Sequence, residues 1–260
     1  MREADLLNPD DPPKAAGLPD GYEVEQFVVR GPERSIGVTY AHRPGNRVFV
    51  QYCGGNEFRR SRDGGGILRQ LARGADVVLF DYPGYGDSTG EPAVATILED
   101  AHAVYDHFID RGAATGKARI VYGFSLGSFV ASALASDRDP DVLVLEGTAP
   151  NVKAWASEMV PLVAKPFVRI SVADELASLD NVGELRNVRS RMYILGGGKD
   201  KRTPPALGRS MAAALAGARA DVQFKLFPAA AHGGIMATPE FPGFWDGLVQ
   251  AASRAAPARP

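Results

Sequence analysis

Ser125 has the sequence surroundings of a nucleophile. It is the central residue of the motif G-F-S-L-G at 123–127, which follows the apolar run 119–122 and precedes a stretch of small residues, 128–136. This order predicts a strand, a sharp turn and a helix, and the two flanking glycines remove side chains that would collide in such a turn. The hydroxyl of Ser125 would then be exposed at the tip, and the N–H of Leu126 would point toward a developing oxyanion.

A serine nucleophile needs a base, and the chain has four histidines. His42 ends a predicted edge strand, whereas His102 and His107 lie on a long amphipathic segment and are expected at the helix surface or half buried. His232 alone lies in a glycine-rich loop after a late predicted strand, on the side of the sheet where Ser125 should lie. We therefore expect His232 to be the base.

The base in turn needs an acid that orients it. Asp200 ends the loop G-G-G-K-D after one predicted strand, and Glu146 ends another. Asp200 is favoured because its loop should neighbour the loop of His232, where a carboxylate could fix the imidazole tautomer through a hydrogen bond. Glu146 stays open as the alternative acid.

The elements that must position these side chains alternate between strands and helices, which predicts a mostly parallel α/β sheet with helices on both faces. Ligands collect at the carboxyl ends of the strands in such sheets. The first two strands should form an antiparallel hairpin at an edge. The candidate strands are 23–29, 35–41, 47–52, 76–80, 119–122, 142–145, 191–195 and 222–227, and the candidate helices end at 73 or cover 93–111, 128–136, 204–215 and 241–254.

The chain is expected to hold one domain. Residues 1–20, rich in proline and acidic residues, predict an extended or mobile arm, and residues 21–256 predict a single domain with a short cap inserted at about 150–188. The loop 81–88 is too rich in proline and glycine for regular structure, and Asp87 or Ser88 is expected to cap the following helix. Arg59, Arg60 and Arg62 are expected on a solvated helix face.

Composition limits the possible partners. The 260 residues carry a formal net charge of -2, which gives no electrostatic reason to expect a nucleic acid or an anionic membrane. The single cysteine, Cys53, excludes an intramolecular disulfide and is expected to be a small buried residue. No secretory, lipidation or membrane-spanning signal is evident, so we expect a cytoplasmic protein without a stable membrane anchor. No metal-spacing or phosphate-cradling motif is present, so no cofactor is implied.

Taken together, the order Ser-Asp-His, the G-F-S-L-G motif, the D-Y-P-G-Y-G-D-S loop at 81–88 and the G-x-x-D…T-P segment at 197–204 resemble the α/β-hydrolase superfamily. Within it the chain is similar to small, short-capped serine hydrolases that include protein depalmitoylases and related acyl hydrolases. The resemblance implies an eight-stranded α/β-hydrolase fold, with Ser125 as nucleophile, His232 as base and Asp200 as acid.

The resemblance also implies an oxyanion hole formed by the N–H of Leu126 and an N–H in the loop after the third strand. We place this second donor at Gly55, with Asn56 as the alternative. Family members commonly have His-Gly in that loop, where this chain has Cys53 followed by glycine. The depalmitoylases also carry a lipidated N-terminal cysteine cluster that this chain lacks.

The expected function is hydrolysis of a small acyl ester or thioester through an acyl-enzyme intermediate. The stretch 150–170 should supply an apolar slot, with Trp155, Met159, Val160, Leu162, Val163, Phe167 and Val168 as its apolar residues. The alternatives are a peptidase or a perhydrolase on the same triad, or a catalytically silent hydrolase fold that serves as a binding module.

Overall fold

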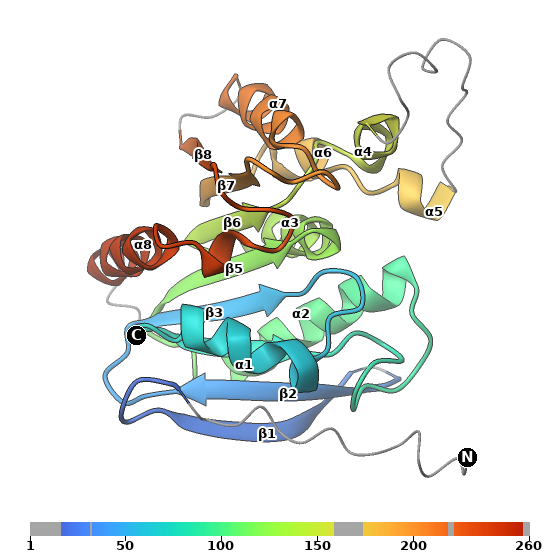
Figure 1. Ribbon diagram of the computed structural model, residues 1–260. Helices are drawn as coiled ribbons and strands as arrows, with labels where there is room; N and C mark the ends of the chain where they lie inside the picture. Colours follow the sequence, from blue (N-terminus) through green and yellow to red (C-terminus); the bar gives the residue numbers. More distant parts are fainter. Residues whose placement is uncertain (1–16, 32, 159–173, 218–220, 257–260) are drawn as a thin grey trace.

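The computed structural model describes residues 17–31, 33–158, 174–217 and 221–256 (Figure 1). Eight strands form one sheet in the order β1-β2-β4-β3-β5-β6-β7-β8. They are β1 (Glu23–Arg30), β2 (Ser35–His42), β3 (Val48–Cys53), β4 (Asp76–Phe80), β5 (Ala118–Phe124), β6 (Val142–Glu146), β7 (Arg191–Gly197) and β8 (Val222–Phe227). All eight predicted strands are present, with boundaries that differ by at most two residues.

Strands β3 to β8 are parallel to one another, and β2 pairs antiparallel with both β1 and β4. The predicted hairpin at the sheet edge is therefore confirmed. Every residue of β3, β4 and β6 is buried, as expected for strands covered on both faces. Strand β8 lies at the opposite edge and pairs with β7 alone within the described chain.

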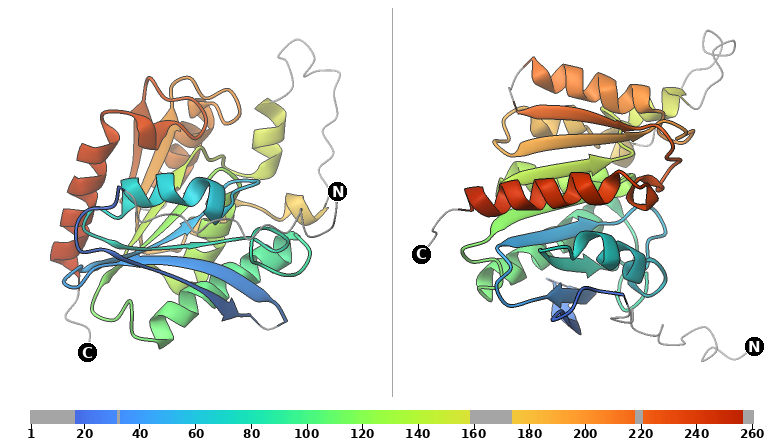
Figure 2. Two further views of the ribbon diagram at one scale, coloured as in Figure 1. Left: turned by 60° about the horizontal axis from the view of Figure 1, so that its bottom comes forward. Right: turned by 60° about the vertical axis from the view of Figure 1, so that its left-hand side comes forward.

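Helices cover both faces of the sheet (Figures 1 and 2). Residues of α1 and α8 pack in the core on one face, and residues of α2, α3 and α7 in the core on the other. The helices are α1 (Arg60–Leu71), α2 (Val94–Asp110), α3 (Leu126–Arg138), α4 (Val152–Glu158), α5 (Asp174–Ala177), α6 (Asn181–Leu185), α7 (Pro205–Ala216) and α8 (Phe241–Ala255), with a short 3₁₀ helix, η3 (Ile235–Ala237). None of the helices in the described ranges has the length and apolar character needed to cross a membrane.

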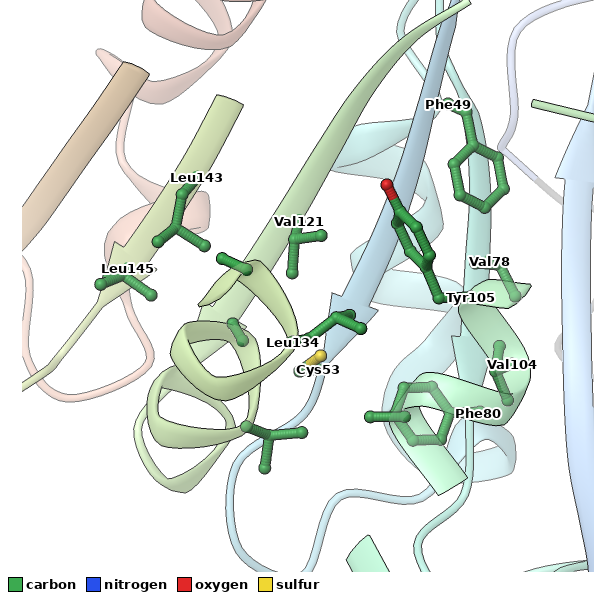
Figure 3. Close-up of a cluster of buried hydrophobic side chains, with 14 of the residues drawn as sticks. Phe49, Cys53, Val78, Phe80, Val104, Tyr105, Val121, Leu134, Leu143 and Leu145 are labelled. Carbon is green, nitrogen blue, oxygen red and sulfur yellow. The ribbon is translucent and has the colours of Figure 1, made fainter. Parts of the chain in front are cut away.

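The core on the α2 and α3 face joins these helices to the centre of the sheet (Figure 3). Phe49 and Cys53 of β3 and Val121 of β5 face Tyr105 of α2 and Leu134 of α3. All five side chains are at most 1% exposed. Burial of this apolar surface holds α3 against the strand that precedes it, and so fixes the turn between them.

The structure corrects two expectations: that Arg60 lies on a solvated helix face, and that Asp87 or Ser88 caps the helix after the loop 81–88. Arg60 is not on a solvated face: it is 3% exposed, and its guanidinium pairs with Asp81 at 2.8 Å and with Asp87 at 2.6 Å. Ser88 does not cap α2, because its hydroxyl donates to the Asp81 carbonyl at 2.7 Å and accepts the Gly37 N–H at 3.0 Å. Asp87 and Ser88 therefore fold the loop back on the sheet instead of starting a helix.

Helix α1 carries three successive glycines at 64–66. A Cβ at Gly65 would have as its nearest neighbour the Arg69 guanidinium at 3.6 Å, and one at Gly66 would meet the same group at 4.0 Å. Side chains would therefore fit at both positions. Glycine inside a helix also costs about 1 kcal/mol of stability relative to alanine. Packing around these two Cβ positions does not require glycine.

Candidate active site

Ser125 occupies a strained turn between β5 and α3. Its backbone has φ 52° and ψ −117°, a conformation that residues other than glycine rarely adopt. A Cβ at Gly123 would lie 2.6 Å from the Cβ of Ala131 and would also collide with the Gly127 carbonyl. A Cβ at Gly127 would collide with the carbonyl oxygens of Cys53 and Gly54. The two glycines thus let α3 begin in contact with both its own strand and the loop after β3.

Hydrogen bonds to the backbone of Ser125 hold this conformation. Its N–H donates to the Glu146 carbonyl at 2.9 Å, which ties the turn to the end of β6. Its carbonyl accepts from the N–H of Ser128 at 2.9 Å and from the Ser128 hydroxyl at 2.6 Å. The backbone of Ser125 is therefore fixed from both sides, and its side chain is left half buried at the tip.

Three side chains from separate loops form a hydrogen-bonded chain. His232, in the loop after β8, has its Nε2 3.1 Å from the Ser125 hydroxyl and its Nδ1 2.9 Å from an Asp200 carboxylate oxygen. Asp200 lies in the loop after β7. The structure thus brings together the three residues predicted from sequence. An imidazole between a hydroxyl and a carboxylate can take the hydroxyl proton while the carboxylate stabilises the resulting cation.

Asp200 is held as a carboxylate. It accepts the N–H groups of Arg202 at 2.9 Å and Thr203 at 2.8 Å, and the Thr203 hydroxyl at 2.7 Å. Burial alone would raise the pKa of Asp200, but the hydrogen bonds from His232 and Thr203 outweigh it and place the pKa below its ordinary value. The charge that would orient and stabilise a protonated His232 is therefore present at neutral pH.

Thr203 contacts two residues of the site, and the sequence did not predict this. Its hydroxyl donates to Asp200 and lies 3.1 Å from His232 Nδ1, so it touches both members of the pair. The available signal was the spacing of Asp200 and Thr203, because a carboxylate commonly accepts the N–H of the residue three positions on at the start of a helix. Phe124 was also overlooked: its ring centroid lies 5.0 Å from that of His232 and supports the imidazole.

Glu146, the alternative acid, has a different partner. It is 2% exposed, and its carboxyl accepts the Tyr122 hydroxyl at 2.6 Å. Burial raises the pKa of Glu146 to about 7, although the hydrogen bond from Tyr122 and the nearby His232 lower it in part. The structure pairs His232 with Asp200 and keeps Glu146 beneath the site, where its backbone carbonyl holds the Ser125 turn.

The loop after β3 lies directly against the serine. A Cβ at Gly55 would be 2.8 Å from the Phe124 ring and 3.5 Å from the Ser125 Cβ, so the Gly55 backbone borders the nucleophile. The Tyr82 hydroxyl donates to the Gly54 carbonyl at 2.7 Å and fixes the loop. Leu126 begins α3, where backbone N–H groups have no partner within the helix. The two predicted oxyanion donors therefore belong to segments that meet at Ser125.

An apolar cavity of about 350 Å³ opens beside these groups. Ser125 and His232 lie in its wall together with Asn56. Apolar side chains from α3, from the loop between β6 and α4, from α4 and from the segment before α6 complete it. These apolar side chains are Leu126, Phe129, Ala149, Val152, Trp155, Leu176 and Leu179. Trp155 is held in place by a hydrogen bond from its indole N–H to the Arg202 carbonyl at 3.0 Å.

Of the residues predicted for an apolar slot, Trp155 does line this cavity. Met159, Val160, Leu162, Val163, Phe167 and Val168 lie outside the described residues. Within the described part of that stretch, 150–158, Val152 and Trp155 line the cavity, and the rest of the slot stays a prediction.

Cys53 lies at the end of β3, fully buried, and burial raises the pKa of its thiol to about 12. A thiol in that state is a poor nucleophile because the reactive thiolate is not formed. Across the ranges that the structure describes, no group of three or more His, Cys, Asp or Glu side chains is arranged to hold a metal ion.

Comparisons of sequence relate the chain to known proteins. The family model for the alpha/beta hydrolase fold matches residues 52–169. An uncharacterized protein of Mycobacterium tuberculosis is 30% identical over 79% of this chain and 71% of its own length. An α/β-hydrolase domain-containing protein of Arabidopsis thaliana is 27% identical over 71% of this chain and 62% of its own. The lysophosphatidylserine lipase of Mus musculus is 28% identical over 70% of this chain and 48% of the lipase.

Solved structures show the same architecture. An esterase of Pyrococcus furiosus superposes with a TM-score of 0.71 at 15% identity and covers 91% of this chain and 92% of its own. A fungal esterase from Rhizomucor miehei superposes with a TM-score of 0.68 at 18% identity and covers 92% of this chain and 85% of its own. At these identities the likeness concerns the fold.

The raised pKa of Glu146 predicts a pH dependence of stability. Its ordinary pKa is 4.5, and its pKa in the folded protein is about 7. Between pH 4.5 and 7 the folded state therefore keeps a proton on Glu146 that the unfolded state has lost. Stability from this group is fully present below pH 4.5 and is lost as the pH rises through 7, by roughly 3 kcal/mol in total. In urea unfolding from pH 5 to 8, the free energy of unfolding of Glu146→Gln should rise relative to that of the wild type as the pH rises. A stability difference that stays constant over this range would contradict the assignment.

Proposed function

Because the chain belongs to the α/β-hydrolase family, we propose that it is a serine hydrolase that cleaves an acyl ester or thioester through an acyl-enzyme intermediate. The observation that carries the proposal is the hydrogen-bonded chain from Asp200 through His232 to Ser125. It links the strained turn after β5 to loops after two other strands, and the apolar cavity opens on the reacting hydroxyl.

In the first half of the reaction the Ser125 oxygen attacks the acyl carbonyl carbon, and His232 Nε2 takes the hydroxyl proton. The carbonyl oxygen becomes an oxyanion that accepts the N–H groups of Leu126 and Gly55. When the intermediate collapses, the bond to the leaving oxygen or sulfur breaks and that atom takes the proton from His232. The acyl group stays on Ser125 as an ester.

In the second half a water molecule takes the place of the leaving group. His232 removes a proton from the water as its oxygen attacks the acyl carbon, and the same two N–H groups hold the second oxyanion. Collapse releases the carboxylic acid and returns the proton to the Ser125 oxygen. Asp200 remains ionised throughout and stabilises the imidazolium in both halves.

The chemistry of the cavity beside Ser125 supports an acyl substrate. Its walls are mostly apolar and the described lining carries one cation, Arg202, and no carboxylate. An aliphatic acyl chain would gain free energy by leaving water there. The names of similar proteins agree with an acyl-ester substrate, since they include esterases and a lysophosphatidylserine lipase. A small-molecule ester or thioester is therefore proposed as the partner, without a cofactor.

Ser125→Ala should abolish ester hydrolysis without unfolding the protein. Loss of the nucleophile costs on the order of 10⁴-fold or more in turnover. A fluorophosphonate probe should label the wild type at Ser125, as mapped by mass spectrometry, and should leave the variant unlabelled. Circular dichroism of both proteins controls for folding. Near-normal turnover of a p-nitrophenyl ester by the variant would refute the proposal, and a folded wild type that neither reacts nor hydrolyses would favour a binding module.

Asp200→Asn should reduce turnover far more than Glu146→Gln. Asparagine at 200 would stabilise the wrong imidazole tautomer, an effect worth about 10⁴-fold in a serine triad. Glu146 makes no hydrogen bond to His232 in the described structure, so Glu146→Gln serves as the matched amide control. The kcat values of both variants on the same ester provide the measurement. Equal losses, or a larger loss for Glu146→Gln, would reverse the assignment of the acid.

The apolar cavity predicts a dependence on acyl length. Each methylene buried contributes up to about 0.8 kcal/mol, or roughly fourfold in kcat/KM, until the cavity is full. Assays with p-nitrophenyl esters from acetate to palmitate, alongside a peptide amide, should show a rise followed by a decline, and slower cleavage of the amide. Trp155→Ala, which removes one wall, should move the optimum to longer chains. A flat series, or faster cleavage of the peptide, would exclude this cavity as an acyl site.

A further inference from the structure

A second cavity, of about 460 Å³, lies on the other side of Asn56 from the apolar one. Asn56 is exposed and lines both cavities. Gly55 and Phe124, the neighbours of Asn56 and Ser125 in sequence, line the second cavity, and so does Gly233, which follows His232. The two cavities therefore flank the reacting groups, and neither the family comparisons nor the triad assigns a role to the second.

Helix α1 forms one side of this second cavity with a distinctive arrangement of side chains. Arg62, Gly66 and Arg69 line it, and their spacing of four and three residues puts them on one face of the helix. Gly66 thus leaves a gap between two arginines. A Cβ there would find open space, with the Arg69 guanidinium 4.0 Å away, so packing does not explain the glycine.

The rim at α1 carries more positive than negative charge. Arg62 pairs with Asp63 at 2.9 Å and also donates to the Glu57 carbonyl at 2.6 Å. Arg69 has no acidic partner among the described residues. The other carboxyl in the wall, Glu146, has a pKa raised to about 7 by burial and is therefore only partly ionised at neutral pH. An anion at the gap would meet donors in excess of acceptors.

The wall of the second cavity also has an apolar part. Tyr52, Phe58, Phe124 and Met236 contribute to its wall, and all four are buried or half buried. A group that extends from the reacting carbonyl past Asn56 would contact these buried and half-buried side chains, and the exposed Arg62 and Arg69 line the same cavity on α1. The cavity therefore suits a ligand with an apolar stem and an anionic end.

We propose that this second cavity binds the leaving group of the substrate, an alcohol or thiol with an apolar stem and an anionic end held at Gly66 between Arg62 and Arg69. The inference rests on the proposed hydrolase function and assigns the two cavities to the two halves of the ester. The acyl chain occupies the apolar cavity beside Leu126, and the leaving atom lies next to His232 Nε2, from which it must take its proton.

Three butyrate esters that share one acyl group test this assignment: methyl butyrate, benzyl butyrate and 4-carboxybenzyl butyrate. The wild type should prefer the 4-carboxybenzyl ester over the benzyl ester, and the benzyl ester over the methyl ester. Gly66→Leu places a side chain in the gap and should lower kcat/KM for the 4-carboxybenzyl ester by about tenfold or more, with methyl butyrate changed by no more than about twofold.

Gly65→Leu is the matched control. It replaces the neighbouring glycine of the same helix by the same residue, but Gly65 does not line the cavity. A Cβ at either position would lie within 4.0 Å of the Arg69 guanidinium, so the difference between the two variants isolates the filling of the gap. It should leave the order of the three esters unchanged, and thermal unfolding of both variants reports on folding. Arg69→Gln should remove the preference for the carboxylate and leave the ratio of benzyl to methyl ester intact. Equal losses on all three esters with Gly66→Leu, or no loss at all, would overturn the proposal.

A binding measurement separates this proposal from the proposed function. 4-Carboxybenzyl alcohol, the free leaving group, should bind the Ser125→Ala protein in calorimetry, and Gly66→Leu in that background should weaken it where Gly65→Leu does not. Binding with this pattern but no hydrolysis by the wild type would refute the hydrolase and keep the cavity. Hydrolysis without binding, and without sensitivity to Gly66→Leu, would refute the cavity and keep the hydrolase.

Discussion

The backbone of α3 approaches the loop after β3 so closely at Gly127 that a single Cβ would collide with two carbonyl groups. This contact depends on β3 and β5 being neighbours in the sheet, although β4 lies between them in sequence. It sets the position of Ser125 relative to Gly55, and therefore that of the proposed nucleophile relative to the proposed oxyanion donor. The strained φ of Ser125 is tolerated because the turn is held by Glu146, by Ser128 and by the core beneath α3.

Much of this arrangement could be predicted because its determinants are local. Apolar runs such as 76–80 and 142–145 mark buried strands. The parallel topology places the loops of Ser125, Asp200 and His232 together at the carboxyl ends of the strands. The burial of Arg60 could not be predicted, because its partners Asp81, Asp87 and Thr39 come from distant segments. The role of Thr203 and the cavity under α1 likewise depend on how loops meet, which neither periodicity nor composition encodes.

The pairing of Arg60 with Asp81 connects the fold to the second cavity. Asp81 accepts the Arg60 N–H at 2.8 Å as well as its guanidinium, so the first turn of α1 is fixed to the end of β4. A buried charge left without its partner is strongly destabilising, and the pair therefore restricts where α1 can lie. The face of α1 that carries Arg62, Gly66 and Arg69 is in this way held in place beside the second cavity. The anchor also offsets part of the helix propensity that the three glycines cost α1.

Strand β8 adds a consequence for how activity would be lost. The proposed base follows this edge strand, whereas the proposed nucleophile follows the central strand β5. Within the described chain β8 pairs with β7 alone, and five of its six residues are half buried or exposed. Segments with few buried apolar contacts can open locally while the rest of a domain stays folded. His232 would then separate from Ser125 while the turn at Ser125 and the central strands stayed intact. Inactivation and global unfolding would accordingly be two distinct events, with the first governed by a cooperative unit at the β8 edge.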